Sequence, residues 1–516
     1  MSSKFYLTCA IPYVNAAPHV GHALEFVQGD VIARYHRLLG EEVLLLSGGD
    51  ENALKNVRAA EIAGIPIQKF VDRNTQQFFD LTKALNSRFD VWQKGSDQKH
   101  HFPASQKLWN LCAKNGDIYK KSYKGLYCVG CETFYLKDEL DQNGECPEHP
   151  GKKLENIAEE NYFFRLSKYQ AQLVELISSD TLKVIPEMRK NEVLSFLKQP
   201  LRDISISRSN ERMKRWGVPV PDDNTQRMYV WFDALNIYQS GIGFCWDEKT
   251  YQKWWPADVH VIGKGIIRFH AVYWPAFLMS AKLLLPKSLV VHGYLTVDGQ
   301  KMSKTLGNII DPFEIIKKYG SDALRYYLLR EIPSFGDGDF SERRFKELYN
   351  ADLANGLGNL VARTLSMLNK YCDGKIPAIE HDPDTHPLRI NTGIYNWKKA
   401  WGDVDKNLKA YQFHESLAAI WKFIKEANKY IDDNKPWELA KNDKKQLAWV
   451  LYGLSDSIHQ LAWQLSPFLP ETARRIAESL NVEKLTSPNP LYKDSWTTIQ
   501  PGTPILTSTS LFPRLS

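Results

Sequence analysis

Residues 4–22 read Lys4-Phe5-Tyr6-Leu7-Thr8-Cys9-Ala10-Ile11-Pro12-Tyr13-Val14-Asn15-Ala16-Ala17-Pro18-His19-Val20-Gly21-His22. The first seven are mostly apolar and β-prone, which predicts a buried strand. The prolines and the asparagine that follow predict a short turn, and the pattern is helical from His19 to about Leu39, ending at Gly40. A buried strand followed by a turn and a helix predicts one half of a parallel α/β sheet.

His19 and His22 lie in the first turn of this predicted helix, and their spacing places them on the same side. Helix N-termini present backbone N–H groups and a partial positive charge, both of which suit phosphate. Imidazoles at this position can donate hydrogen bonds without adding a fixed charge, and Gly21 lets a nucleotide approach the backbone. For this segment alone, two surface histidines that cap a helix are an equally good interpretation.

A second candidate segment lies past the middle of the chain and reads Lys301-Met302-Ser303-Lys304-Thr305. It follows a predicted buried strand at 288–292 and a tight turn at Asp298-Gly299. Lysines on a loop beyond the carboxyl end of a strand can swing onto phosphates and balance the charge of departing pyrophosphate. A solvated basic loop is the alternative. The sequence has no Gly-x-x-x-x-Gly-Lys-Ser/Thr motif, so a P-loop is excluded.

Together the two segments resemble the nucleotide-binding signatures of class I aminoacyl-tRNA synthetases, and the similarity, which runs through nearly the whole chain, is greatest to the methionine-specific family. The resemblance implies a Rossmann-type catalytic domain. It also implies a two-step reaction, in which ATP activates methionine as an adenylate and the terminal adenosine 2′-hydroxyl of tRNA then takes the aminoacyl group. The implied substrates and cofactors are L-methionine, ATP with Mg²⁺, and initiator and elongator methionine tRNA. The implied catalytic residues are His19, His22, Lys301 and Lys304. The implied ATP-binding set adds Gly21, Gly263, Lys264 and Ser303.

The composition is compatible with such an enzyme but is not specific for it. A chain of 516 residues with 43% hydrophobic residues is long enough for three or four domains with real cores. The net charge of +6 fits a local basic face for nucleic acid. No run of eighteen apolar residues occurs, and the first residues lead directly into a core strand. We therefore expect no membrane span, no signal peptide and a cytoplasmic protein.

Three of the seven cysteines cluster with a histidine. The pair Cys128 and Cys131 is followed, after fourteen residues, by Cys146 and His149. Three thiolates and one imidazole at this spacing form a tetrahedral set that zinc favours, and the closed set predicts a structural metal. A disulfide is the weaker alternative inside a cell. In the resembling family such a knuckle belongs to an insertion between the halves of the nucleotide-binding fold.

The alternation of strands and helices predicts how the chain is divided. Further strands are expected at 42–46 and 259–263, and long helices near 353–371, 411–433 and 444–464. Together with the resemblance, this pattern divides the chain into six expected units. The catalytic domain is expected in two halves, at 1–114 and 226–295, with the zinc-knuckle insertion between them at 115–225. The lysine loop with a stem-contact region is expected at 296–350, a helical anticodon-binding bundle at 351–485 and an irregular tail at 486–516. Because the chain lacks the additional dimerising domain of some relatives, we expect a monomer.

A methionine pocket has to be apolar and deep, with a carboxylate for the substrate ammonium. The resemblance assigns this carboxylate to Asp50. The other positions that match the family's methionine site are Ala10, Ile11, Tyr13, Trp231, Ala234, Tyr238, Phe269, His270 and Trp274. Ordinary aromatic core is the alternative for any one of them. Two positions depart from the family: Asn52 stands where histidine is common, and Gly265 where aspartate is common.

Three residues in the helical part match the family's anticodon readers: Asn359, Arg363 and Trp437. Asn359 and Arg363 are four apart on the polar face of the predicted helix at 353–371. Trp437 follows Pro436, which ends the preceding helix. Amide and guanidinium groups can bond base edges, and an exposed tryptophan can stack on an unpaired base. A plain solvated face and a packing tryptophan are the alternatives.

Other enzymes and a non-enzymatic function compete with this interpretation. The family's leucine, isoleucine and valine enzymes carry a large editing domain, for which the chain is too short, and the cysteine enzyme places zinc at the amino-acid site. A catalytically inactive relative that binds RNA or regulates is the alternative outside the enzyme class. The intact His19, His22, Lys301 and Lys304 argue against it.

Overall fold

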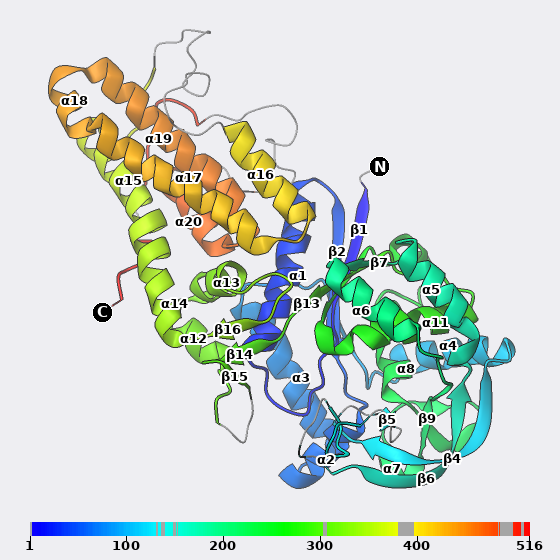
Figure 1. Cartoon of the computed structure of the whole chain (residues 1–516). Helices are drawn as coiled ribbons and strands as arrows, with labels where there is room; N and C mark the ends of the chain where they lie inside the picture. The colour runs from blue at the N-terminus through cyan, green and yellow to red at the C-terminus, as the bar shows by residue number, and fades with distance from the viewer. Residues whose placement is uncertain are drawn as a thin grey trace.

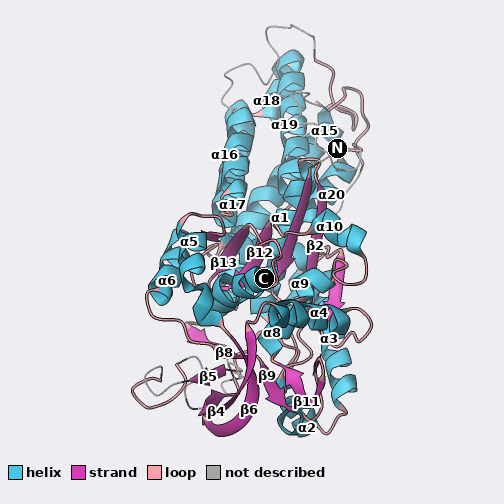
Figure 2. Ribbon diagram, turned by 90° about the vertical axis from the view of Figure 1, so that its right-hand side faces the viewer, coloured by secondary structure: helices cyan, strands magenta, loops and turns pink. Residues whose placement is uncertain are grey.

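The computed structural model describes residues 3–130, 133–135, 140–147, 151, 153–302, 307–379, 397–482, 485, 499–506 and 510–515. Figures 1 and 2 show an α/β part built around a sheet and a bundle of helices at one end of it. The cysteine Cys131, the histidine His149, Ser303 and Lys304 lie outside the described residues.

The central sheet has six parallel strands in the order β3-β2-β1-β12-β13-β7. They are β1 (Lys4–Cys9), β2 (Glu42–Gly49), β3 (Val91–Lys94), β12 (Val259–Gly263), β13 (Ser288–His292) and β7 (Lys183–Ile185). The predicted parallel sheet is therefore confirmed, including the strands at 259–263 and 288–292. Strand order reverses between β1 and β12, which places a ligand crevice at their carboxyl ends.

One strand of this sheet comes from the segment expected to be wholly an insertion. β7 pairs with β13 in parallel, with Val184 beside Leu289. The other strands of that segment form two antiparallel sheets. The larger is ordered β5-β4-β6-β8, with β5 at Thr133–Tyr135 and β8 at Ile204–Ser205. The smaller is ordered β10-β11-β9, with β9 at Ser207–Ser209, β10 at Pro219–Val220 and β11 at Asp223–Met228. The long strands of the first are β4 (Ile118–Cys128) and β6 (Glu155–Phe164). These antiparallel strands lie at the end of the molecule opposite the helical bundle (Figures 1 and 2).

The two faces of the parallel sheet are covered by different helices. Leu45 of β2 belongs to one buried cluster together with residues of α1 (Val20–Leu38) and α3 (Ile67–Ala84). Its neighbours Leu44 and Leu46 belong to a second cluster with residues of α4 (His101–Lys114) and α11 (Trp274–Ser280). Successive residues of a strand point to opposite faces, so a strand buried on both sides is apolar throughout.

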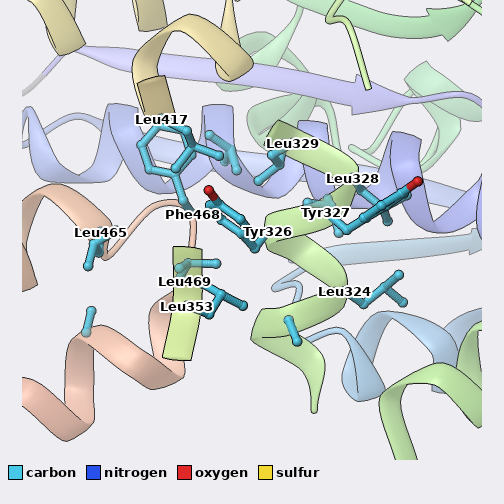
Figure 3. Packing of buried hydrophobic residues seen from close by; sticks show 14 of the residues in the cluster. Leu324, Tyr326, Tyr327, Leu328, Leu329, Leu353, Leu417, Leu465, Phe468 and Leu469 are labelled. Atoms are coloured by element: carbon cyan, nitrogen blue, oxygen red, sulfur yellow. The ribbon is translucent and has the colours of Figure 1, made fainter. Parts of the chain in front are cut away.

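The C-terminal part is a bundle of helices, as predicted. Its long members are α15 (Asn359–Tyr371), α17 (Phe413–Asn434) and α19 (Lys444–Leu465), with α16 (Trp397–Lys409), α18 (Pro436–Asn442) and α20 (Pro470–Ser479) beside them. The expected helix at 353–371 begins instead as a π-helical segment, η5 (Tyr349–Gly358), and α15 continues it. α13 (Ser321–Arg330) joins the bundle to the sheet, since its Tyr326 packs near Phe468 and Leu417 (Figure 3).

The tail is irregular where it is described, yet it packs against the bundle. Ile499 and Phe512 are buried, and Arg475 of α20 donates a hydrogen bond to the Leu511 carbonyl at 3.0 Å. Among the described residues, none of the helices has the length and apolar character that a membrane span needs.

Candidate active site

The histidines at the start of α1 cap the helix. His19 is the N-cap residue, and its Nδ1 accepts the Gly21 backbone N–H at 3.1 Å. Nδ1 of His22 accepts the His19 backbone N–H at 3.2 Å. The ring centroids lie 4.0 Å apart, so both rings are on one side, as predicted. The imidazoles and the Ile310 carbonyl accept the backbone N–H groups of His19, Val20 and Gly21, which the sequence alone left without partners.

This capping determines the tautomer of both rings. A neutral imidazole has one donor and one acceptor nitrogen. Because each Nδ1 accepts a backbone N–H, the ring proton is on Nε2. Burial lowers the pKa of His19 to about 4. Burial and the neighbouring ring of His19 lower the pKa of His22 well below its usual value. At neutral pH the helix therefore offers two uncharged Nε2–H donors, which can bond phosphate oxygens.

The two sequence segments that predicted ATP binding meet in the fold. Cε of Met302 lies 3.4 Å from the position that a β-carbon on Gly21 would occupy. The Val20 backbone N–H donates to the Ile310 carbonyl at 3.2 Å, so the chain on the far side of the lysine loop also touches α1. Lys301 lies in β15 (Gln300–Lys301), which pairs with β14 (Leu295–Val297). The lysine loop thus begins beside the histidines although 280 residues separate them.

Glu25 is a part of this site that the sequence reasoning missed. One of its carboxylate oxygens accepts the Ala10 backbone N–H at 2.8 Å, and the other lies 3.0 Å from Nε2 of His292. It therefore links the carboxyl ends of β1 and β13 across the point where the strand order reverses. Its position one turn after His22 on α1 was the signal available in the sequence.

The residues expected to hold methionine come together beside this crevice. Tyr13 and Asp50 form a parallel bridge, and Asp50 is 3% exposed. The Trp231 ring stacks on Phe269 with centroids 3.7 Å apart and meets the Tyr13 ring edge-on at 6.1 Å. Ala10 and Ala234 are also buried, whereas Ile11 is partly exposed.

Tyr238, His270 and Trp274 lie deeper and are almost completely buried. Nδ1 of His270 lies 3.0 Å from the Ile266 carbonyl, so it carries the ring proton, and Nε2 accepts the Tyr238 hydroxyl at 2.9 Å. Burial lowers the pKa of His270 to about 4. These three residues therefore form a neutral, hydrogen-bonded aromatic wall, and aromatic side chains make favourable contacts with a thioether.

The unusual Asn52 supports this wall from behind. Its side-chain amide donates to the Gly95 carbonyl and to Asp233, each at 2.7 Å. Asp233 lies between Trp231 and Ala234 on α8 (Val230–Ala234), and its other oxygen is 2.6 Å from Nε2 of His101. Asn52 thus fixes α8 in place.

Gly263 ends β12 at the carboxyl edge of the sheet, and Lys264 follows it. Gly263 lies against the His292 ring. Lys264 forms an ion pair with Asp337, with Nζ 2.7 Å from Oδ2.

Only half of the expected zinc ligands can be described. Cys128 ends β4, Cys146 lies in the following loop, and both are fully buried. Cys131 and His149 lie outside the described residues. Within the part of the chain that the structure describes, no group of three or more histidine, cysteine or acidic residues is placed to hold a metal.

The three expected anticodon readers lie on the helical bundle. Asn359 and Arg363 are one turn apart on α15, and their side chains contact Asn428 at 3.1 Å and Asp432 at 2.6 Å on α17. Trp437 is the second residue of α18, directly after α17, and is 41% exposed. Part of its side chain is therefore open to solvent.

Comparison with known proteins agrees with these features. A family model described as tRNA synthetases class I (M) matches residues 5–365, and one described as the anticodon binding domain of methionyl tRNA ligase matches residues 394–516. The methionine–tRNA ligase of Thermotoga maritima is 40% identical over 99% of this chain and 80% of its own length. That of a Nostoc species is 43% identical over 92% of this chain and 89% of its own.

A solved structure shows the same architecture. The methionyl-tRNA synthetase of Mycobacterium tuberculosis in complex with methionyl-adenylate superimposes with a TM-score of 0.92. It is 39% identical, and the match covers 99% of this chain and 100% of that one. With family models matching both the catalytic and the helical part, the chain belongs to the class I methionyl-tRNA synthetases.

Proposed function

We propose that His19, His22, Lys301 and Lys304 are the catalytic residues of a methionine–tRNA ligase. The enzyme activates L-methionine with ATP to methionyl-adenylate and pyrophosphate, then transfers methionine to tRNA. The contact of Met302 with the Gly21 backbone carries the assignment of these residues, since it joins the segments that bear them. ATP–pyrophosphate exchange measured with each of the twenty amino acids tests the function. Exchange with methionine alone supports it, and exchange with none favours an RNA-binding protein without catalysis.

In the proposed first step, the two Nε2–H groups of His19 and His22 donate to phosphate oxygens of ATP. As the methionine carboxylate attacks the α-phosphate, negative charge builds up on the departing pyrophosphate, and Lys301 and Lys304 balance it. Gly21, Gly263, Lys264 and Ser303 complete the proposed ATP site. Mg²⁺ is proposed to accompany the ATP phosphates, where it neutralises their charge.

Methionine is proposed to bind with its ammonium at Asp50 and its side chain between Trp231, Phe269 and Tyr13. The stacked Trp231–Phe269 pair supplies a flat apolar surface, and sulfur–aromatic contacts contribute about 0.3–1.5 kcal/mol each. His270 supports the binding site as a neutral group held by Tyr238. The proposed lining is Ala10, Ile11, Tyr13, Trp231, Ala234, Tyr238, Phe269, His270 and Trp274.

A structural zinc is proposed at Cys128, Cys131, Cys146 and His149. The complete burial of the Cys128 and Cys146 thiols beside an antiparallel sheet fits a closed zinc site. Bound zinc would crosslink the strand end to the loop and so stabilise the insertion.

The helical bundle is proposed to read the CAU anticodon with Asn359, Arg363 and Trp437. The exposure of Trp437 and the polar side chains that α15 and α17 present support this proposal. Use of both initiator and elongator tRNA, a monomeric state, a cytoplasmic location and the domain limits given above remain predictions of the same proposal.

A further inference from the structure

Three residues of the proposed methionine pocket lie on two very short helices. α8 carries Trp231 and Ala234, and α9 (Ile237–Ser240) carries Tyr238. α8 has five residues and α9 four, and neither has a side-chain cap at its first turn. Helices of this length are not stable by themselves. Contacts with the rest of the protein therefore have to hold these three side chains in place.

His101, at the start of α4, contacts both short helices with its two ring nitrogens. Nε2 lies 2.6 Å from Oδ1 of Asp233 on α8, and Nδ1 lies 2.7 Å from the hydroxyl oxygen of Ser240 on α9. All three side chains are almost completely buried. Because water cannot replace a partner at such a place, removing one leaves the other unsatisfied. His101 therefore joins α8 to α9 through hydrogen bonds that solvent cannot restore.

The carboxylate of Asp233 is also held from other directions. The hydroxyl of Ser105, one turn after His101 on α4, donates to Oδ1 at 3.3 Å. The amide of Asn52 donates to Oδ2 at 2.7 Å and to the Gly95 carbonyl, just after β3, at 2.7 Å. Both amide protons of Asn52 are thereby used. The loop after β2, the end of β3 and α4 are thus all connected to one carboxylate on α8.

Asp233 acts on the pocket through the helix that it shares with Trp231. Successive residues of a helix are turned by about 100°, so Trp231 and Ala234 share a side while Asp233 lies nearly opposite Trp231. The Trp231 ring stacks on Phe269 with centroids 3.7 Å apart, which is van der Waals contact. A movement of α8 would therefore change the width of the proposed pocket directly.

We propose that His101 is a positioning residue for methionine. By binding Asp233 and Ser240 it holds α8 and α9, and with them Trp231 and Tyr238, at the separation that fits the substrate side chain. The proposal rests on the methionine pocket proposed above. His101 acts from behind the aromatic wall and touches neither methionine nor ATP. The expected effect of losing it is therefore on the binding and selection of the amino acid, not on the chemistry at the phosphates.

Two substitutions of His101 separate its two contacts. An asparagine amide can take the place of Nδ1 and a glutamine amide that of Nε2, so His101→Asn keeps the contact with Ser240 and His101→Gln that with Asp233. In ATP–pyrophosphate exchange, KM for methionine is expected to rise about tenfold in His101→Asn and less in His101→Gln. KM for ATP is expected to stay unchanged in both. Asp233→Ala should raise KM for methionine at least as much as His101→Asn, and the double variant should add nothing to Asp233→Ala.

Discrimination between amino acids gives a readout that a loss of stability does not change. Ethionine has one methylene group more than methionine, and one methylene changes kcat/KM by about 10- to 200-fold in a fitted apolar pocket. Wild type is expected to prefer methionine over ethionine within this range. His101→Asn is expected to lose most of the preference, because α8 and α9 can then move apart.

Asp117→Asn is the matched control. Asp117 is also a completely buried carboxylate, and it accepts hydrogen bonds from Tyr169 at 2.5 Å and Ser280 at 2.8 Å, away from α8 and α9. This variant is expected to lower the thermal midpoint, with KM for methionine and the preference over ethionine unchanged. If His101→Asn does not fold, Ser240→Ala and Asn52→Ala carry the test, since each removes one hydrogen bond and should raise KM for methionine about threefold.

The outcomes separate this proposal from the proposed function. Wild-type KM for methionine and wild-type preference over ethionine in the folded variants of His101, Ser240 and Asn52 would overturn the positioning role. An equal rise in KM for ATP, or the same kinetic defect in Asp117→Asn, would also overturn it, because the effect would then be a general distortion. A wild type without methionine-dependent exchange would instead refute the proposed function.

Discussion

Nη1 of Arg325 lies 2.8 Å from Oδ2 of Asp30, and both side chains are completely buried. Asp30 is on α1, the helix that His19 and His22 cap, and Arg325 is on α13. The same guanidinium donates to the carbonyls of Phe468 at 2.7 Å and Pro467 at 2.9 Å, at the end of α19. One buried arginine therefore joins the catalytic part to the helical bundle.

Replacing this arginine should destabilise the protein strongly. Burial acts to raise the pKa of Asp30, but Arg34 and Arg325 hold it below its usual value. In Arg325→Ala the carboxylate loses a buried partner, and the carbonyls of Phe468 and Pro467 lose their donor. We expect the free energy of unfolding in urea to fall by about 3–5 kcal/mol. The control is Arg343→Ala, because Arg343 is 81% exposed and its ion pair with Glu347 should contribute about 0.2–1 kcal/mol. Equal losses in the two variants would contradict the prediction.

The stability of the protein should fall as the pH is lowered from 6.5 to about 4. Burial lowers the pKa of His19, His270 and His459 to about 4, so the unfolded chain takes up their protons at higher pH than the folded one. Burial raises the pKa of Asp456 to about 6, so the folded chain takes up this proton at higher pH than the unfolded one. The resulting gain in stability offsets the loss from about one of the three histidines. Urea unfolding at pH 7, 6 and 5 measures the slope. His459→Gln, outside the active site, should reduce it by about 1.4 kcal/mol per pH unit. An unaltered slope in that variant would show that His459 is protonated equally in both states.

Trp231→Phe should weaken methionine binding specifically. The smaller ring loses part of the stacked surface against Phe269, so KM for methionine in pyrophosphate exchange should rise about tenfold while KM for ATP stays constant. Trp109→Phe is the matched control. Trp109 is also almost completely buried, but its ring packs against Tyr162 and Phe232 rather than against Phe269 and Tyr13. It should lower the thermal midpoint with no change in KM, and a shared kinetic defect would argue against a pocket role for Trp231.

Cys146→Ser should remove zinc and lower the thermal midpoint together, since metal binding and folding of the insertion are coupled. Atomic emission spectrometry of protein purified without chelators should find about one zinc per wild-type chain and far less in the variant. Cys245→Ser, at an exposed thiol outside the knuckle, should keep both properties. Full zinc content in Cys146→Ser would remove this residue from the ligand set.

Trp437→Ala should affect only the step that uses tRNA. Loss of one stacked base costs about 1–3 kcal/mol, so kcat/KM for tRNA charging should fall by a factor of about 5 to about 160. Methionine-dependent exchange of ATP and pyrophosphate, which needs no tRNA, should not change. Trp246 is exposed to a similar extent on the catalytic part, and Trp246→Ala is the control for losing an exposed tryptophan. A charging defect of the same size in both variants would contradict anticodon stacking.

Local patterns of apolar and polar residues were enough to predict most of the strands and long helices. The apolar strands at 4–10, 42–46, 259–263 and 288–292 form the sheet with small shifts of their ends. The helices predicted near 411–433 and 444–464 correspond to α17 and α19. A strand buried on both faces has to be apolar throughout. In an amphipathic helix, apolar residues have to recur about once per turn. A short window of sequence is therefore enough to recognise either element.

The contacts that complete the site depend on residues far apart in the chain. The sequence indicated phosphate-binding histidines at 19 and 22, but only the fold shows that their Nδ1 atoms cap α1 and leave Nε2–H as the donor. The sequence showed glycine at 265 and asparagine at 52 as departures from the family it resembles. The tertiary structure places Gly265 against the Tyr294 side chain and joins Asn52 to Asp233 by a hydrogen bond. The pairing of Asp30 with Arg325 had no local signal at all, because 295 residues separate them. Periodicity determines which face of an element is buried, whereas strand order and helix packing decide which distant side chain meets it.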